Sequence, residues 1–126
     1  IIKLLKTTLL KLMKTKSAKA KGKRLQNRVR DLLVEKYSKV LEEGDFKSTT
    51  MGESGIDIQL SPAARKKFPW AVECKNQESL AIWKCLEQAE SAAEDESLKP
   101  VLIFKRNRSK TYACLELKDF LDLLDE

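Results

Sequence analysis

Histidine is missing from this chain of 126 residues, and cysteine, glycine and proline are scarce. Without histidine, the chain can form neither a Ser-His-Asp hydrolase triad nor a zinc site with imidazole ligands. Its three cysteines, Cys74, Cys85 and Cys114, are odd in number and show no Cys-x-x-Cys spacing. We therefore expect neither a disulfide framework nor a zinc site, and we expect a reducing, cytoplasmic environment.

Acidic residues are absent from residues 1–30, although this segment carries eleven lysines and arginines. All 19 acidic side chains lie in the rest of the chain, and the overall net charge is +6. A basic segment beside an acidic remainder indicates a polyanion as partner. The alternative is a solvated basic tail without a specific ligand.

Long apolar runs are also missing, because lysines interrupt every apolar stretch of residues 1–20. We therefore expect no stable membrane insertion. The apolar pairs in this segment recur at roughly helical spacing, which predicts a basic amphipathic N-terminal arm. Such an arm could bind DNA, an acidic partner or a membrane surface. The polar residues 15–23 are typical of a linker.

Residues 21–126 show the pattern of one α/β domain. Helices are predicted at 22–41, 62–68, 79–93 and 117–124, and strands at 46–50, 56–60, 70–75, 100–104 and 111–115. Ser61 and Pro62 mark the start of the short second helix, and Gly44 could cap the first. We expect the overall order α-β-β-β-α-β-β-α, a mixed β-sheet flanked by helices, with Trp70 and Trp83 in the core.

The most informative feature is an acid on one predicted strand and an acid and a lysine on the next. Asp57 lies in Gly55-Ile56-Asp57-Ile58, and Glu73-Cys74-Lys75 ends the run that begins at Trp70. Two carboxylates and an ammonium group suit a divalent cation and a phosphodiester. Asp57, Glu73 and the backbone carbonyl of Cys74 would be metal ligands, and Lys75 would stabilise charge on the phosphoryl group. The alternative is an ordinary cross-strand charge cluster.

With these motifs, the chain resembles the PD-(D/E)xK nuclease superfamily, and within it the small phage endonucleases and the archaeal-type Holliday junction resolvases. The resemblance covers roughly residues 21–118 and includes Lys21-Gly22, Gly52 and Gly55 before Asp57, and Glu73-Cys74-Lys75. It implies a restriction-endonuclease-like fold, a Mg²⁺ cofactor that Mn²⁺ can replace, and cleavage of branched or double-stranded DNA by a homodimer. Roles in DNA recombination or repair, in the nucleoid or a phage-infected cell, would follow.

One position departs from the resolvase pattern, which has a glutamate in the first helix four residues after the glycine. Here that residue is Gln26, whose amide oxygen could still contact a metal but brings no charge. Glu53 could supply the missing carboxylate, or it could be an exposed turn residue. Gln88 could reach the site from the following helix, or it could lie on a solvated surface.

Further residues are candidates for contact with DNA phosphates. They are Lys21, Lys23, Arg24 and Arg28 in the first helix, Ser48, Thr49 and Thr50 beside the first strand, and Lys105, Arg106, Arg108 and Lys110 in a predicted hairpin loop. The leading interpretation is a metal-dependent, structure-specific DNA endonuclease. The alternatives are a sequence-specific or nicking endonuclease and a non-catalytic nucleic-acid-binding domain with a nuclease fold.

Overall fold

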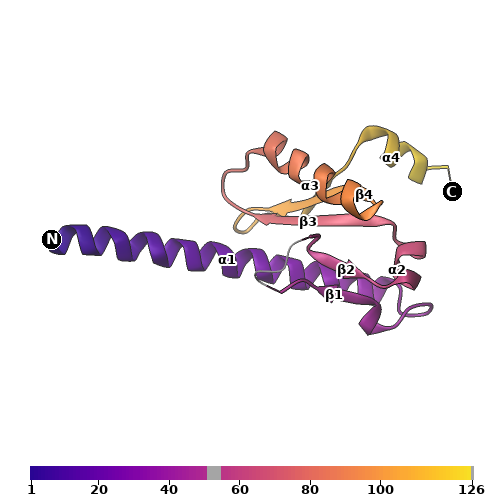
Figure 1. The fold of residues 1–126 in the computed structure, drawn as a ribbon, viewed down its shortest axis with the longest axis horizontal. Helices are drawn as coiled ribbons and strands as arrows, with labels where there is room; N and C mark the ends of the chain where they lie inside the picture. Colours follow the sequence, from indigo (N-terminus) through magenta and orange to yellow (C-terminus); the bar gives the residue numbers. More distant parts are fainter. Residues whose placement is uncertain (51–54, 126) are drawn as a thin grey trace.

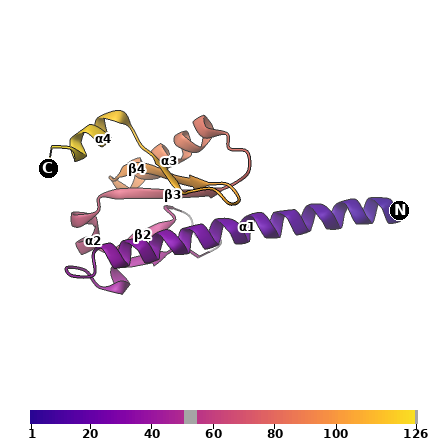
Figure 2. The same ribbon diagram turned by 180° about the vertical axis from the view of Figure 1, so that it is seen from behind.

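The computed structural model describes residues 1–50 and 55–125. Two small sheets and three shorter helices form the body of the molecule, which lies beside one half of the long first helix, α1 (Figure 1). Its other half protrudes from the body of the molecule, so the N-terminus lies far from the C-terminus (Figures 1 and 2). In the part of the chain that the structure describes, no helix is both long and apolar enough to cross a membrane.

The helix α1 runs without a break from Ile2 to Lys36. The linker predicted at residues 15–23 is therefore wrong, and so is the extension of the helix to residue 41. Lysine, alanine and arginine favour helix, and the glycine among them, Gly22, costs only about 1 kcal/mol relative to alanine. The helix ends at Tyr37, whose N–H donates to the Leu33 carbonyl at 3.0 Å. Gly44 lies in the 3₁₀ helix Glu43–Asp45 and is not the left-handed cap that the sequence suggested.

The strands form two sheets rather than the single mixed sheet that was predicted. An antiparallel pair consists of β1 (Phe46–Ser48) and β2 (Ile58–Leu60). A mixed sheet consists of β3 (Trp70–Asn76), the parallel β4 (Lys99–Lys105) and the antiparallel β5 (Tyr112–Cys114). The two sheets are joined where the Asp57 N–H donates to the Val72 carbonyl at 3.1 Å. Because β1 and β2 are only three residues long, this contact does not extend into a ladder.

The remaining helices are α2 (Pro62–Lys67), α3 (Ile82–Glu96) and α4 (Leu117–Leu123). The helix predicted at residues 62–68 is confirmed as α2, although the overall order α-β-β-β-α-β-β-α left it out between the second and third strands. Its start signal is confirmed, because the Ser61 hydroxyl accepts a hydrogen bond from the Ala64 N–H at 3.1 Å. The observed chain is therefore a mixed α/β domain whose element order differs from the prediction by this helix.

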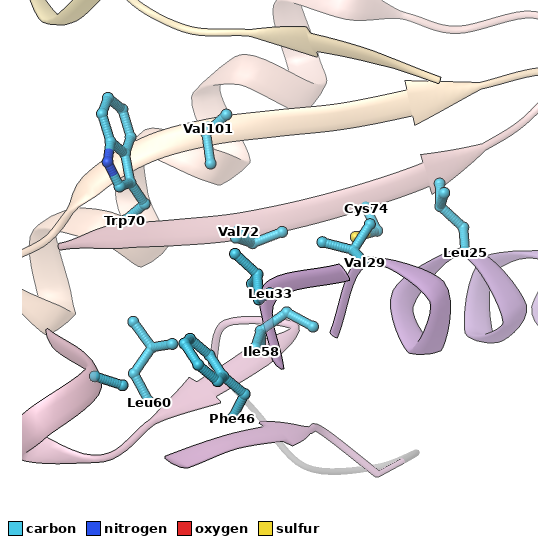
Figure 3. Packing of buried hydrophobic residues seen from close by; sticks show 11 residues of the cluster. Leu25, Val29, Leu33, Phe46, Ile58, Leu60, Trp70, Val72, Cys74 and Val101 are labelled. Carbon is cyan, nitrogen blue, oxygen red and sulfur yellow. The ribbon is translucent and has the colours of Figure 1, made fainter. Parts of the chain in front are cut away.

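The main core lies between α1, the small sheet and one face of β3. Leu25, Val29 and Leu33 line the buried side of α1 and face Val72 and Cys74 of β3 (Figure 3). This packing fixes the C-terminal half of α1 across β3. It therefore sets the position of the polar residues that α1 carries beside the end of that strand.

A second, smaller cluster joins α3 to the sheet. Ala93 of α3 packs against Ala71 of β3 and against Ile56, which lies just before Asp57. Trp70 is buried as predicted, but Trp83 is wrong as a core residue, since 78% of it is exposed on α3. Cys85 and Ala89 supply the side of α3 that turns inward, and Trp83 lies outside that stripe.

Candidate active site

Asp57, Glu73 and Lys75 line one pocket of about 420 Å³, between α1 and the edge of β3. Residues from four parts of the chain form its walls: α1, the end of β1, the segment before β2, and β3. The other lining residues are Lys19, Gly22, Lys23, Gln26, Thr49, Thr50, Gly55 and Cys74. The structure thus brings together the two acids and the lysine that the sequence singled out.

The backbone around Asp57 is held on both sides. Its carbonyl accepts a hydrogen bond from the Thr49 N–H at 2.9 Å, and its own N–H donates to Val72 of β3. Its carboxylate oxygen Oδ2 accepts the Cys74 N–H at 2.6 Å, a short bond to a charged acceptor. Oδ1 accepts no hydrogen bond from residues 1–50 or 55–125. Asp57 is therefore fixed in position with one oxygen available to a ligand.

Glu73 and Lys75 are two residues apart on β3, so their side chains project to the same side of the strand. The Lys75 Nζ lies 3.6 Å from the Glu73 Oε1. Only 17% of the Glu73 side chain and 25% of the Lys75 side chain are exposed. The pair is therefore partly desolvated, whereas an ordinary cross-strand charge cluster, the alternative interpretation, would lie on a solvated face.

Two carboxylates, of Asp57 and Glu73, lie close together in a poorly solvated part of the pocket. Burial, followed by the neighbouring Asp57 carboxylate, raises the pKa of Glu73 to about 6, although Lys75 opposes the shift. Burial also raises the pKa of Asp57, against the Cys74 N–H and the charges of Lys75 and Lys23. Each carboxylate would thus be easier to ionise with a further positive charge between them.

Cys74 contributes its backbone rather than its thiol. Burial raises the pKa of the thiol well above its ordinary range, and the Asp57 and Glu73 carboxylates raise it further. A thiol in such surroundings stays protonated and is a poor nucleophile. All three cysteines, Cys74, Cys85 and Cys114, are free.

Gln26 is buried in the wall of the pocket and makes structural hydrogen bonds. Its Nε2 donates to the Thr49 carbonyl at 2.7 Å and to the Ser48 hydroxyl at 2.8 Å. The Lys23 Nζ donates to the same two groups, at 2.7 Å and 3.2 Å. Together they tie α1 to the end of β1. A glutamate at residue 26 could not donate these bonds, which gives a physical reason for an amide there.

The donor set suits a hard cation such as Mg²⁺. Mg²⁺ binds through one or two carboxylates and keeps several waters, which substrate phosphates can replace. Asp57 and Glu73 supply the carboxylates, and Gln26 retains an amide oxygen in the same pocket. Within the described ranges, no group of three or more carboxylates, thiols or imidazoles is available to a metal.

One of the suggested supporting residues is not in the pocket, and the structure does not describe the other. Glu53 lies outside the described residues. Gln88 is exposed on α3 and does not line the pocket, because Cys85 and Ala89 form the side of α3 that faces the sheet. Its supporting role remains a prediction from the resemblance.

The predicted DNA-contacting residues fall into separate groups. Lys23 and Thr50 line the active-site pocket, whereas Ser48 serves mainly as a hydrogen-bond partner for Gln26 and Asn27. Lys21 lines a second pocket, of about 310 Å³, between α1 and the end of β3. Arg24 and Arg28 are exposed on α1.

The basic loop between β4 and β5 lies near this second pocket, which Asn107 of the loop helps to line. Arg106, Arg108 and Lys110 are exposed, and Lys105 is half-buried at the end of β4. Arg108 has a φ of 57°, and the Ser109 hydroxyl braces the turn by accepting the Arg106 N–H at 3.0 Å. The loop is thus an exposed basic hairpin connection.

Sequence reasoning missed Lys19, and it considered Thr49 only as a possible phosphate contact. Lys19 lies one helical turn before Lys23 on the same side of α1, so the spacing could have indicated it once the helix was known to be continuous. Thr49 is buried, and its hydroxyl donates to the Ile56 carbonyl at 2.5 Å, which steadies the segment leading to Asp57. Nothing in the sequence around Thr49 indicates this hydrogen bond, because the neighbouring Ser48 and Thr50 could form similar ones.

Fold and pocket together define a small mixed α/β protein with two acids and a lysine in a basic-walled pocket. Residues 17–126 match the protein family described as "Phage putative PDDEXK endonuclease". Because the match covers most of the chain, the protein belongs to this family, a branch of the PD-(D/E)xK superfamily of nucleases. No match to the chain was found among curated proteins or among solved structures.

Proposed function

We propose that the protein is a Mg²⁺-dependent DNA endonuclease that hydrolyses phosphodiester bonds at the pocket of Asp57, Glu73 and Lys75. The observation that carries the proposal is the joint placement of these three side chains, partly desolvated, in one pocket of an endonuclease family member. Mn²⁺ is expected to substitute for Mg²⁺, since both prefer oxygen ligands.

Asp57 and Glu73 would hold the cation, with the Cys74 carbonyl and the Gln26 amide oxygen as further ligand candidates. When bound, such a cation neutralises phosphate charge and lowers the pKa of a coordinated water. The short bond from the Cys74 N–H orients the Asp57 carboxylate, and the two bonds from Gln26 hold the opposite wall in place. This chain therefore supplies a preorganised set of oxygens.

Lys75 would act on the reacting phosphate. Its ammonium group already lies beside Glu73, and it can donate to a phosphoryl oxygen or orient an attacking water while that pair persists. Lys19 and Lys23 give the same pocket a basic wall on the α1 side. A phosphate entering the pocket would thus meet ammonium groups from two directions.

Branched DNA, such as a four-way junction, is the substrate that we infer within this class. The domain is small, and basic residues are spread over α1 and the β4–β5 loop rather than gathered in one base-reading element. Such a distribution favours contacts to phosphates over reading of base edges. Cutting two strands of a junction would require two pockets, which a homodimer provides.

Cleavage assays with purified protein test the proposal. Supercoiled plasmid and a labelled four-way junction are incubated with Mg²⁺ or Mn²⁺, with EDTA as the metal-free condition. We expect cleavage that needs the metal and that Asp57→Asn abolishes, because asparagine keeps an oxygen for the Cys74 N–H but loses the charge. Asp95→Asn, at an exposed acid of α3, is the matched control and should cleave like the original chain.

The possible results separate the alternatives. A junction cut much faster than a linear duplex of equal length supports the branched substrate. One discrete site in a duplex of mixed sequence would indicate a sequence-specific enzyme, and open-circular plasmid alone would indicate a nicking enzyme. Binding without cleavage of either DNA would contradict the enzyme and leave a nucleic-acid-binding domain.

A further inference from the structure

Two helical faces on this molecule expose apolar side chains to solvent. On the protruding half of α1, the exposed fractions are 72% for Ile2, 63% for Leu5, 57% for Leu9 and 56% for Leu12. These residues recur at intervals of three and four, so they form one stripe along the helix. A contiguous exposed apolar stripe is typical of an interaction surface.

The second face belongs to α4. Leu117, Phe120, Leu121 and Leu124 lie on one side of this helix and its C-terminal cap, and they are 46% to 69% exposed. None of the residues of α4 is buried. A helix of seven residues is not stable in water by itself, so it needs tertiary or intermolecular contacts.

The two faces carry opposite charge. Residues 1–14 contain Lys3, Lys6, Lys11 and Lys14 and no acid. Residues 116–125 contain four acids and one lysine: Glu116, Asp119, Asp122, Asp125 and Lys118. A basic amphipathic helix and an acidic one are complementary both in their apolar faces and in their charge.

These faces lie at opposite ends of the molecule, with the start of α1 on one side and α4 on the other (Figures 1 and 2). They therefore do not meet within one chain. We propose that residues 2–13 of α1 in one copy bind α4 of a second copy, so that the partner of this surface is the protein itself. If the contact is made reciprocally, two copies close into a symmetric dimer with two α1–α4 contacts.

Other partners cover only part of these surfaces. DNA phosphates would neutralise the lysines of α1 but leave Leu5 and Leu9 in water. An anionic membrane would accept α1 but repel the acidic α4. Pairing α1 with α1 would bring lysines together, and pairing α4 with α4 would bring acids together. A second copy covers both apolar faces and pairs opposite charges.

The proposal does not depend on the nuclease reaction, because these residues lie outside the active-site pocket. It is tested by sedimentation equilibrium of the whole chain over a range of concentrations, without DNA or metal. One variant reverses α1 charge (Lys3→Glu, Lys6→Glu and Lys11→Glu), and another reverses α4 charge (Asp119→Lys, Asp122→Lys and Asp125→Lys). The matched control reverses two exposed charges of α3, Glu87→Lys and Glu90→Lys.

We expect the original chain and the α3 control to associate with the same dissociation constant, and each reversed variant to associate at least tenfold more weakly. Mixing the two reversed variants should restore the association, because every α1–α4 contact then joins opposite charges. Restoration also shows that both variants are folded.

If the original chain is monomeric, the proposal is overturned. This also holds if the monomer binds anionic vesicles of phosphatidylglycerol. An association that survives α4 reversal would indicate α1–α1 pairing and would also overturn it. An association that survives α1 reversal would indicate α4–α4 pairing, and it would overturn the proposal too. Circular dichroism of each variant at the same concentrations checks that lost association is not lost folding.

Discussion

The two halves of α1 have the same kind of apolar stripe and opposite surroundings. In the C-terminal half, Leu25, Val29 and Leu33 are buried against β3 and the small sheet. In the N-terminal half, Leu5 and Leu9 remain more than half exposed. Helical periodicity therefore predicts which side of a helix is apolar, but not whether the rest of the chain is available to cover it.

The active-site pocket lies where the two halves meet. Lys19, Gly22, Lys23 and Gln26 form its α1 wall, where the exposed residues 1–20 give way to buried and partly buried ones. The packing of the buried half holds Lys23 and Gln26 where they can donate hydrogen bonds to the end of β1, while the protruding half stays accessible. The C-terminal half of α1 thus contributes core contacts, and the N-terminal half is the one for which we propose association.

The largest effect should be catalytic, and it separates the active-site pocket from the protruding half of α1. Lys75→Met is expected to lower kcat by about 10²–10³-fold, because it removes an ammonium group beside the reacting phosphate while keeping the aliphatic chain. Lys11→Met on the exposed half should leave kcat unchanged at saturating DNA. Single-turnover cleavage of the same labelled DNA measures both. Equal rates for the Lys75 variant and the original chain would remove Lys75 from the reaction.

Stability should differ next. Leu25→Ala deletes a buried side chain and is expected to lower the free energy of unfolding by about 2–5 kcal/mol. Leu9→Ala on the exposed half should change it by less than about 0.5 kcal/mol. Urea unfolding followed by circular dichroism, below the concentration at which the chain associates, compares them. A large loss for Leu9→Ala would show that the N-terminal half is packed within one copy.

A substitution of Gln26 tests how much the hydrogen bonds between α1 and the end of β1 contribute to stability. Gln26→Glu loses both bonds from Nε2 and places a carboxylate against the Thr49 carbonyl. We expect a loss of about 1–3 kcal/mol in unfolding free energy. Gln88→Glu makes the same change on the exposed face of α3 and should be nearly neutral. If Gln26→Glu unfolds like the original chain, these bonds contribute little to the fold.

The smallest effect concerns DNA affinity at the boundary of the two halves. Lys19→Gln should weaken binding of catalytically inactive protein and lower the slope of log affinity against log salt by about 1, the value for one phosphate contact. Lys84→Gln, on the exposed surface of α3, serves as the control. Fluorescence anisotropy at several salt concentrations measures both slopes. Identical slopes for Lys19→Gln and the original chain would place Lys19 away from the DNA.

Local signals predicted much of this fold. The alternation around Asp57 and the apolar run before Glu73 placed these acids on neighbouring segments, and the Ser61-Pro62 pair located the start of α2. Physical causes also explain the failures. Residues 15–23 look like a linker because they are polar, but their lysines and alanines extend a helix that is already nucleated.

Contacts between distant residues were beyond prediction. That Gln26 would donate to Thr49, or that Lys19 would reach the pocket, depends on how α1 crosses β3. The division into two sheets depends on how few residues of β1 and β2 pair. Trp83 has a large apolar side chain of the kind that usually lies in a core. It is exposed nevertheless, because Cys85 and Ala89 form the side of α3 that faces the sheet.

In the proposed reaction, Asp57 and Glu73 hold a divalent cation for phosphodiester cleavage. Isothermal titration of Mn²⁺ into the whole chain and into Asp57→Asn and Glu73→Gln tests it most directly, with Glu90→Gln on α3 as control. We expect saturable Mn²⁺ binding to the original chain and to the control, and loss of this binding in both pocket variants. Equal Mn²⁺ binding by all four proteins, or none by the original chain, would contradict it.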